Sequence, residues 1–397
     1  MNPRTVYLDH AATTPMAPAA IEAMTAELAL VGNASSLHAS GRRARRVLEE
    51  SRERIAAALG SRPGEVVFTS GGTEADNLAL KGAFWARRSQ DPARTRILSS
   101  TVEHHAVLDP LHWLEATEGA QIELVPCDET GRIDLAAMKA AVERDPGSVA
   151  VISVMWANNE VGTLQPAPEI AALAAEHGIP VHTDAVQAVG AVPVDFATSG
   201  VDALSLTGHK LGGPVGAGAL VVRRELELTA LVHGGGQERD VRSGTHATAA
   251  IAGFAAAVEL AVKEQEAYAT RVGALRDRLV EQVLAAVPDS HLNGPPLEPL
   301  GRYRLPNNAQ IAFPGCEGDS LLMLLDAAGV ECSTGAACSA GVPQASHVLL
   351  AMGQSDEQAR SSLRFSLGHT TTDEDVDRLV AAIGPAVERG RAAGLNR

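Results

Sequence analysis

Short apolar runs alternate with amphipathic stretches through the first two-thirds of the chain. Continuous apolar runs such as 149–154 are typical of strands buried on both faces of a sheet. The predicted strands are 65–69, 96–100, 122–126, 149–155, 179–182 and 203–206. A helical pattern over 74–85 follows the first strand. This alternation predicts an α/β domain with a mostly parallel sheet.

The last third of the chain has a different pattern. Residues 248–287 form one long predicted helix with an apolar face made by Leu275, Leu279, Val283 and Val287. A Gly-Pro turn at 293–296 follows, and further strands are predicted near 308–313 and 363–366. We therefore predict two domains, a large α/β domain over 15–255 and a small α+β domain formed by 1–14 and 256–397.

Composition restricts the classes of protein that this chain can belong to. Of its 397 residues, 45% are hydrophobic and 20% charged, a globular balance. With 33 basic against 48 acidic residues, the net charge of −15 disfavours binding to nucleic acid or to anionic lipid. No apolar run approaches the ~18 residues that cross a bilayer, and no signal-peptide pattern is present. We expect a cytoplasmic protein with no nucleic-acid or membrane partner.

The four cysteines are Cys127, Cys316, Cys332 and Cys338. None forms a C-x-x-C pair, so we expect neither a zinc site nor a disulfide framework. Cys338 lies in a stretch of small polar residues, 331–341, which suits an exposed reactive thiol. We interpret the other three as packing or structural residues.

Three further segments could carry chemistry. A glycine turn at 70–73 joins a strand to a helix and could bind one phosphate group, although a plain helix start with a threonine cap fits as well. Asp184 follows a predicted strand, where it could cap a helix or pair with a ring nitrogen. Lys210 stands in a glycine-rich bend where desolvation could free its amine for Schiff-base chemistry.

These segments belong to a series of motifs that together resemble one family. In chain order the motifs are YLDHAATTP at 7–15, GGTE at 71–74, TVEHHAV at 101–107, NNEVG at 158–162, DAVQ at 184–187, GHK at 208–210, RSGT at 242–245, GAACS at 335–339 and SLRFSLG at 362–368. In this order they resemble the cysteine desulfurases, which are fold-type I pyridoxal-phosphate enzymes of the class V aminotransferase group. The resemblance spans nearly the whole chain and implies a large domain with a seven-stranded, mostly parallel sheet between helices.

The resemblance also implies roles around a pyridoxal 5'-phosphate cofactor. Lys210 would hold the cofactor covalently, and Asp184 would pair with its ring nitrogen. His104 would stack on the ring and take part in proton transfer. Its remaining cofactor contacts would come from Gly72, Thr73, Thr207 and His209 at the phosphate, from Gln187 and Asn159 at the phenolic oxygen, and from Thr245 of the partner subunit. A homodimer is therefore expected.

The substrate implied by the resemblance is L-cysteine. Arg364 would bind its carboxylate bidentately, with help from Asn33. Cys338, as thiolate, would attack the substrate sulfur, which leaves a persulfide on the enzyme and releases alanine. Lys210 would move protons at the substrate α-carbon.

Other activities share many of these residues. A selenocysteine lyase would use almost all of them. In another class V aminotransferase or a cysteine sulfinate lyase, Cys338 would be incidental. A catalytically silent scaffold subunit is disfavoured, because Lys210, Asp184 and Arg364 are all intact. The sulfur acceptor stays open between an iron–sulfur scaffold, a tRNA-thiolation enzyme and a cofactor-sulfuration protein.

Overall fold

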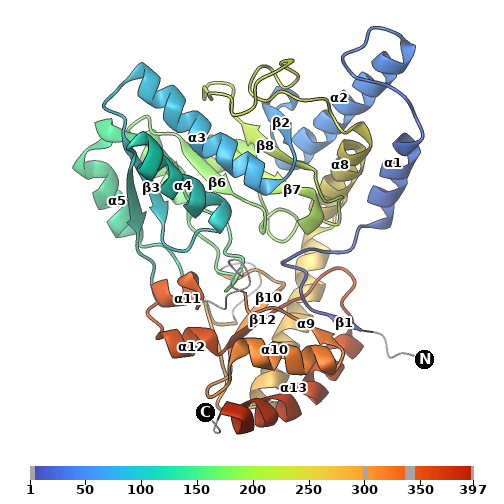
Figure 1. Ribbon diagram of the computed structural model, residues 1–397, viewed down its shortest axis with the longest axis vertical. Coiled ribbons are helices and arrows are strands. Elements are labelled where there is room, and N and C mark those ends of the chain that lie inside the picture. The colour runs from blue at the N-terminus through green and yellow to red at the C-terminus, as the bar shows by residue number, and fades with distance from the viewer. Residues whose placement is uncertain (1–4, 298–302, 336–344, 395–397) are drawn as a thin grey trace.

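A seven-stranded sheet forms the centre of the larger part of the molecule, drawn uppermost in Figure 1. The structure is a computed structural model and describes residues 5–297, 303–335 and 345–394. The strands, in order across the sheet, are β2 (Val66–Thr69), β8 (Gly218–Val222), β7 (Ala203–Thr207), β6 (Val181–Asp184), β5 (Val149–Ser153), β3 (Arg96–Ser100) and β4 (Gln121–Val125). β8 runs antiparallel to β2 and β7, and the other neighbours are parallel. The predicted mostly parallel α/β sheet is confirmed.

Helices cover both faces of this sheet, because successive side chains of a strand point to opposite sides. Val66 and Phe68 pack into one core, whereas Val67 between them packs into another. The helices that contribute to the first core are α2 (Ala39–Leu59), α5 (Leu135–Arg144), α6 (Ala167–Ala175), α7 (Phe196–Ser199) and α8 (Thr248–Lys263). The opposite face is covered by α3 (Gly72–Gln90) and α4 (His105–Glu118). On the outside, α1 (Pro18–Leu28) packs against α8.

The smaller part of the molecule has its own core. Its sheet is antiparallel, with β10 (Asn308–Ala312) between β9 (His291–Leu292) and β12 (Ser362–Ser366). Near the chain start, β1 (Val6–Tyr7) pairs with β11 (Val330–Glu331). The helices of this part are α9 (Gln265–Ala286), α10 (Gly318–Ala327), α11 (His347–Ala351), α12 (Asp356–Arg360) and α13 (Asp373–Gly394). Val6 and Leu8 are buried in the same core as α9 and α13, so the N-terminal strand packs with the C-terminal third.

The long helix predicted over 248–287 is two helices. Glu264 ends α8 and precedes α9, and its backbone leaves the helical region at φ −95° and ψ 3°. Leu275, Leu279, Val283 and Val287 are buried on one face of the second segment, as predicted. Because α8 continues past residue 255 to Lys263, the domain boundary at 255 falls inside a helix and stays a prediction.

The sequence did not predict β8. The glycines at 212–218 were interpreted as a bend, and the strand that follows returns antiparallel between β2 and β7. This return joins the edge strand β2 to the sheet and brings the glycine turn at 70–73 beside the bend that carries Lys210. Across the described residues, no helix combines the length and the apolar character needed to span a membrane.

Candidate active site

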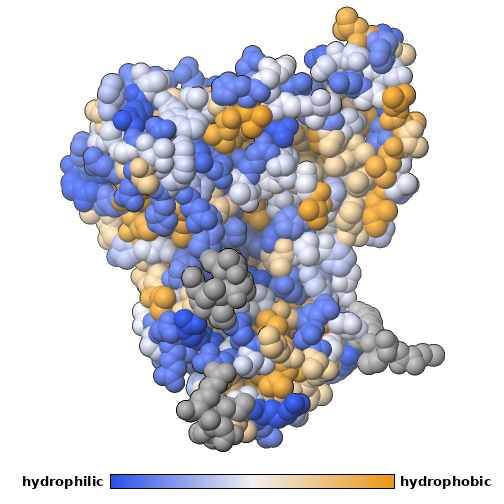
Figure 2. All heavy atoms as spheres, viewed as in Figure 1, coloured by the Kyte–Doolittle hydropathy of each residue, from blue (hydrophilic) through white to orange (hydrophobic). Residues whose placement is uncertain are grey.

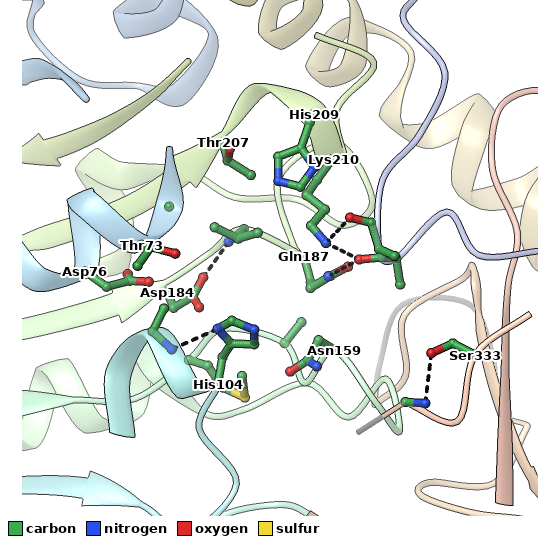
Figure 3. A pocket seen from close by; sticks show the side chains of 18 of the residues that line it. Thr73, Asp76, His104, Asn159, Asp184, Gln187, Thr207, His209, Lys210 and Ser333 are labelled. Atoms are coloured by element: carbon green, nitrogen blue, oxygen red, sulfur yellow. Dashed lines mark hydrogen bonds between the residues drawn. The ribbon is translucent and has the colours of Figure 1, made fainter. Parts of the chain in front are cut away.

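A cavity of about 390 Å³ opens at the carboxyl ends of the sheet strands, where α/β proteins bind ligands. Ten of the predicted site residues line it: Gly72, Thr73, His104, Asn159, Asp184, Gln187, Thr207, His209, Lys210 and Arg364. Figure 3 shows side chains such as His104, Asp184 and Lys210 converging from separate segments of the larger part of the molecule, with Ser333 at the side of the smaller part. The two parts of the molecule therefore share one cavity.

Lys210 lies in a short 3₁₀ turn, Gly208–Lys210, directly after β7. Its Nζ atom donates to the carbonyl oxygens of Ala11 and Ala12, the latter at 2.7 Å. Burial and the nearby Arg364 guanidinium lower the pKa of Lys210 to about 8. The amine is thus far easier to deprotonate than a surface lysine, which is the condition for nucleophilic amine chemistry.

Asp184 ends β6, and a second buried carboxyl, that of Asp76, is near enough to affect its pKa. Its Oδ1 atom accepts a hydrogen bond from the Val186 amide at 2.9 Å. Burial and then the Asp76 carboxyl raise the pKa of Asp184. The Asp76 Oδ1 atom has no hydrogen-bond partner among the described residues, and lies 3.5 Å from Nε2 of the buried His182. A cationic ring nitrogen in the cavity would stabilise the ionised form of Asp184.

The other end of the cavity has the features of a phosphate site. Gly71 precedes α3 with φ +151°, so the turn adopts a backbone that other residues avoid. The first amides of α3 have no partner within the helix and are free to bind an anion. Thr73, Thr207 and His209 also line this cavity. Burial, together with Lys210, lowers the pKa of His209 to about 4, so its imidazole is neutral at pH 7.

His104 and Gln187 border the middle of the cavity. His104 precedes α4, and its Nδ1 accepts a hydrogen bond from the Ala106 amide at 3.0 Å. Burial and Lys210 lower the pKa of His104 to about 4, so a neutral imidazole faces the cavity. Gln187 donates from Nε2 to the carbonyl oxygen of Ala11 at 3.0 Å.

Arg364 projects from β12 in the smaller part of the molecule and is 5% exposed. Its guanidinium donates to the Asn159 carbonyl oxygen at 3.0 Å and to Asp9 Oδ1 at 2.8 Å. Its Nε atom has no partner within the described part of the chain. A buried arginine that keeps a free donor is suited to binding a carboxylate.

Two predicted site residues do not line this cavity, and a third cannot be placed relative to it. Asn33 and Thr245 are exposed and do not line it. Cys338 lies outside the described residues. Of the other cysteines, Cys332 is partly buried against the core of the smaller part of the molecule, and burial raises the pKa of its thiol to about 12. Cys332 is therefore protonated and unreactive at pH 7.

The sequence did not identify some residues that the structure places at the site. Asp76 lines the cavity one helical turn after Thr73. Residues three positions apart on a helix lie on the same face, so this spacing could have identified Asp76 as a site residue. Asp9 pairs with Arg364 although 355 positions separate them, so no local pattern pointed to this contact. Ser333 and Gly335 line the cavity from the smaller part of the molecule.

Comparison with known proteins identifies the family. Residues 6–379 match the aminotransferase class-V family. The chain belongs to the class-V aminotransferase family. The "IscS-like cysteine desulfurase" of Mycobacterium tuberculosis is 56% identical over 389 residues, covering 98% of both chains. "Cysteine desulfurase IscS" of Dictyoglomus turgidum is 43% identical and covers 98% of this chain and 96% of its own.

Solved structures agree with these relatives. A "NifS-like protein" is 33% identical and superposes with a TM-score of 0.88 over 97% of this chain and 100% of its own. These class-V aminotransferase relatives confirm two predictions, the fold-type I architecture and the cysteine desulfurase activity, in preference to the selenocysteine lyase alternative.

Proposed function

We propose that this class-V aminotransferase converts L-cysteine to L-alanine with pyridoxal 5'-phosphate and passes the sulfur through Cys338. The observation that carries the proposal is the composition of the cavity. A desolvated Lys210 amine, a buried Asp184 carboxyl and the Arg364 guanidinium all line it. These three groups suit an aldehyde, a ring nitrogen and a substrate carboxylate, respectively.

The residues of the cavity fit the proposed cofactor. The turn at Gly71 and Gly72 leaves room for a phosphate: a Cβ at Gly72 would come 2.9 Å from the Val186 side chain. Thr73, Thr207 and His209 supply polar groups beside it. When bound, pyridoxal phosphate acts as an electron sink for the substrate α-carbon. Asp184 would keep its ring nitrogen protonated, with Gln187 and Asn159 near the phenolic oxygen.

In the proposed reaction, Arg364 holds the cysteine carboxylate, and Lys210 takes up and returns the proton of the α-carbon. The Cys338 thiolate attacks the substrate sulfur, so a sulfur–sulfur bond forms while the carbon–sulfur bond breaks. The carbon fragment takes up a proton and leaves as alanine. One cysteine and one enzyme thiol thus give one alanine and one persulfide, without an external oxidant.

The test measures alanine released from L-cysteine by the purified protein with a reductant present. The wild type releases alanine. Cys338→Ala retains the visible absorbance band of the bound cofactor but transfers no sulfur, whereas Lys210→Ala loses that band. A band that survived Lys210→Ala would contradict the cofactor assignment, and equal alanine from Cys338→Ala would remove Cys338 from the mechanism.

We further propose that the active form is a homodimer and that the persulfide sulfur goes to an acceptor protein, such as an iron–sulfur scaffold or a tRNA-thiolation enzyme. Thr245 is exposed in the single chain, as expected of a residue that acts at a subunit interface. An apolar patch, Ile21, Leu28, Leu30, Val31 and Leu37, also stays exposed on and beside α1. In Figure 2 orange surface follows α1 and the loop toward α2 along the right of the molecule.

A further inference from the structure

The start of α3 carries a carboxylate close to the place where the cofactor phosphate is proposed to bind. Glu74 lies in the first turn of α3, next to Thr73. Its Oε2 atom accepts a hydrogen bond from the Ser70 amide at 2.7 Å. This contact satisfies a backbone donor, but it also brings a negative charge to the helix end that should attract an anion. Unless it is neutralised, Glu74 would repel a phosphate.

Arg242 neutralises Glu74 from a distant part of the chain. Its Nε atom lies 2.8 Å from Glu74 Oε1, and its second guanidinium contact, to Oε2, is 3.4 Å. The two side chains are 21% and 17% exposed, so solvent screens the pair weakly. Although burial acts to raise it, the pKa of Glu74 is lowered by its hydrogen bonds with Arg242 and Ser70. Glu74 is therefore ionised, and Arg242 balances its charge.

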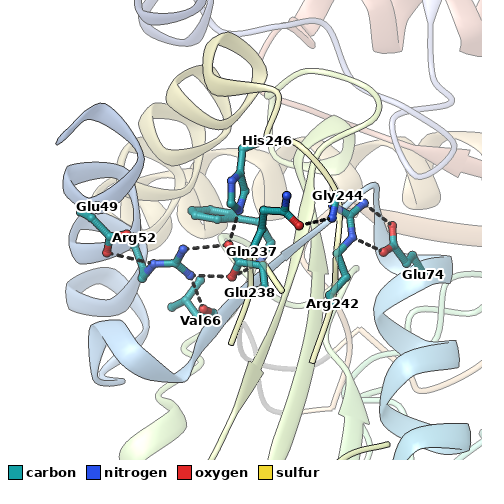
Figure 4. A network of polar contacts seen from close by, with 10 residues as sticks. Glu49, Arg52, Val66, Glu74, Gln237, Glu238, Arg242, Gly244 and His246 are labelled. Atoms are coloured by element: carbon teal, nitrogen blue, oxygen red, sulfur yellow. Dashed lines mark hydrogen bonds and ion pairs between the residues drawn. The ribbon is translucent and has the colours of Figure 1, made fainter. Parts of the chain in front are cut away.

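A separate network fixes the segment that presents Arg242, as Figure 4 shows. Glu238 pairs with Arg242 through the backbone and accepts two hydrogen bonds from the buried Arg52, each at 2.8 Å. Glu238 also receives hydrogen bonds from the Phe68 amide at 3.2 Å and from His246. Arg242 is thus held at a defined position rather than at the end of a free loop.

We propose that Arg242 is a positioning residue for the cofactor phosphate: by neutralising Glu74 it keeps the start of α3 able to bind an anion. The inference rests on the proposed use of pyridoxal phosphate and extends it to a residue that touches no cavity group. Arg242 belongs to the RSGT motif, for which the proposed function assigns a role to Thr245 alone. The effect of losing Arg242 must be specific for the cofactor phosphate, because the negative charge of Glu74 repels the phosphate and not the ring.

The test compares two ligands, pyridoxal phosphate and pyridoxal, on the full chain stripped of cofactor. Affinity is read from the visible absorbance band in the wild type, Arg242→Met, Glu74→Gln and the double variant. Glutamine keeps an oxygen that can accept from the Ser70 amide. Arg242→Met is expected to weaken pyridoxal phosphate binding about tenfold or more and to leave pyridoxal within about twofold of the wild type. The double variant is expected to return to within about threefold of the wild type.

Two results would overturn the inference. One is an equal loss for both ligands without recovery in the double variant, which would assign Arg242 a purely structural role. The other is an affinity for pyridoxal phosphate, relative to that for pyridoxal, that does not change in Arg242→Met. Thermal melting of each variant checks that it folds. Arg144→Met is the matched control, because Arg144 pairs with Glu123 on β4, at the opposite edge of the sheet, and should change neither affinity. If the wild type formed no Lys210-dependent band, the proposed function itself would fail instead.

Discussion

Burial sets the protonation state of the residues that face the cavity. Desolvation favours the neutral form of every group, so it lowers the pKa of the basic Lys210 and His104 and raises that of the acidic Asp184. The imidazoles of His104 and His209 are thus neutral at pH 7, whereas Lys210, with a pKa of about 8, is still mostly protonated there. Arg364 lines the cavity and forms an ion pair with Asp9. A cationic ring nitrogen would lie beside Asp184, and an anionic phosphate would lie at the start of α3.

The depressed pKa of Lys210 predicts how cofactor uptake depends on pH. The neutral amine attacks the aldehyde, and it predominates above the pKa of about 8. The rate at which the apoprotein gains its visible band should therefore rise with pH up to about 8 and level off above. A lysine with its ordinary value of 10.5 would keep accelerating through pH 10. Stopped-flow absorbance at a series of pH values distinguishes the two profiles.

A variant that removes the charge of Arg364 tests the cause of this pH profile. The Arg364 guanidinium is the second cause of the low Lys210 pKa. Arg364→Gln should consequently move the levelling point to higher pH, because the protonated amine loses a nearby repelling charge. An unchanged levelling point would mean that Arg364 does not act on Lys210 in solution.

Individual site residues were predictable where a chemically suitable residue type stands at the end of a predicted strand. Lys210, Asp184 and Thr73 each follow a strand end, and such ends meet at one edge of a parallel sheet. Asp76 and Asp9 were missed for a different reason. Their importance comes from contacts with His182 and Arg364, which are made only after distant segments pack together.

At the scale of elements, β8 determines how the phosphate turn meets the lysine bend. Gly218 at its start pairs with Thr207 on one side and with Thr69 on the other. An added Cβ at Gly218 would lie 2.7 Å from Gly71 Cα and 2.7 Å from the Leu206 carbonyl oxygen. Such backbone contacts cannot relax by a side-chain rotation, so this position requires glycine for close approach.

Gly218→Ala should therefore destabilise the fold and weaken the cofactor site together. Overpacking of this kind costs about 1–3 kcal/mol, and the displaced Gly71 turn belongs to the proposed phosphate site. Denaturant unfolding gives the stability, and titration with pyridoxal phosphate gives the affinity. Gly384→Ala is the control: Gly384 lies in α13 with open space around its Cβ position, and alanine there should stabilise by about 0.5–1 kcal/mol. Normal stability in Gly218→Ala would contradict the close packing of β8 against the turn.

Elements with a long apolar or alternating pattern were predictable, whereas short or interrupted ones were not. The strand over 149–153 is buried throughout and was recognised from its continuous apolar run. β1, β9 and β11 have two residues each, too few for a pattern to emerge. The break at Glu264 carries neither glycine nor proline, so no residue there marks the end of one helix and the start of the next.

At the scale of the whole molecule, the cavity is built from both parts of the chain. Two residues proposed to contact the substrate or the cofactor, Asn33 and Thr245, nevertheless do not line it. Thr245 lies shortly before α8 begins, and α8 packs against α1 and α2. The apolar patch lies on and beside α1, one of the helices that pack against α8. Val31 and Leu37 are 82% and 88% exposed, which is unusual for side chains of this type unless a surface is covered in the assembly. A second copy of this chain is the occupant that would also bring Thr245 to a neighbouring site.

Placing two carboxylates in the patch should therefore separate the subunits and weaken the cofactor site together. In Val31→Asp/Leu37→Asp, each interface would bury four unpaired charges, which opposes association strongly. Light scattering should give a dimer mass for the wild type and a monomer mass for the variant, and the variant should lose pyridoxal phosphate faster on dialysis because Thr245 of the partner subunit is gone. Met323→Asp is the matched control, since Met323 on α10 is 70% exposed but lies in the smaller part of the molecule. A monomeric wild type would leave Thr245 without a role at the phosphate of a partner subunit, and a variant that stays dimeric would place the interface elsewhere.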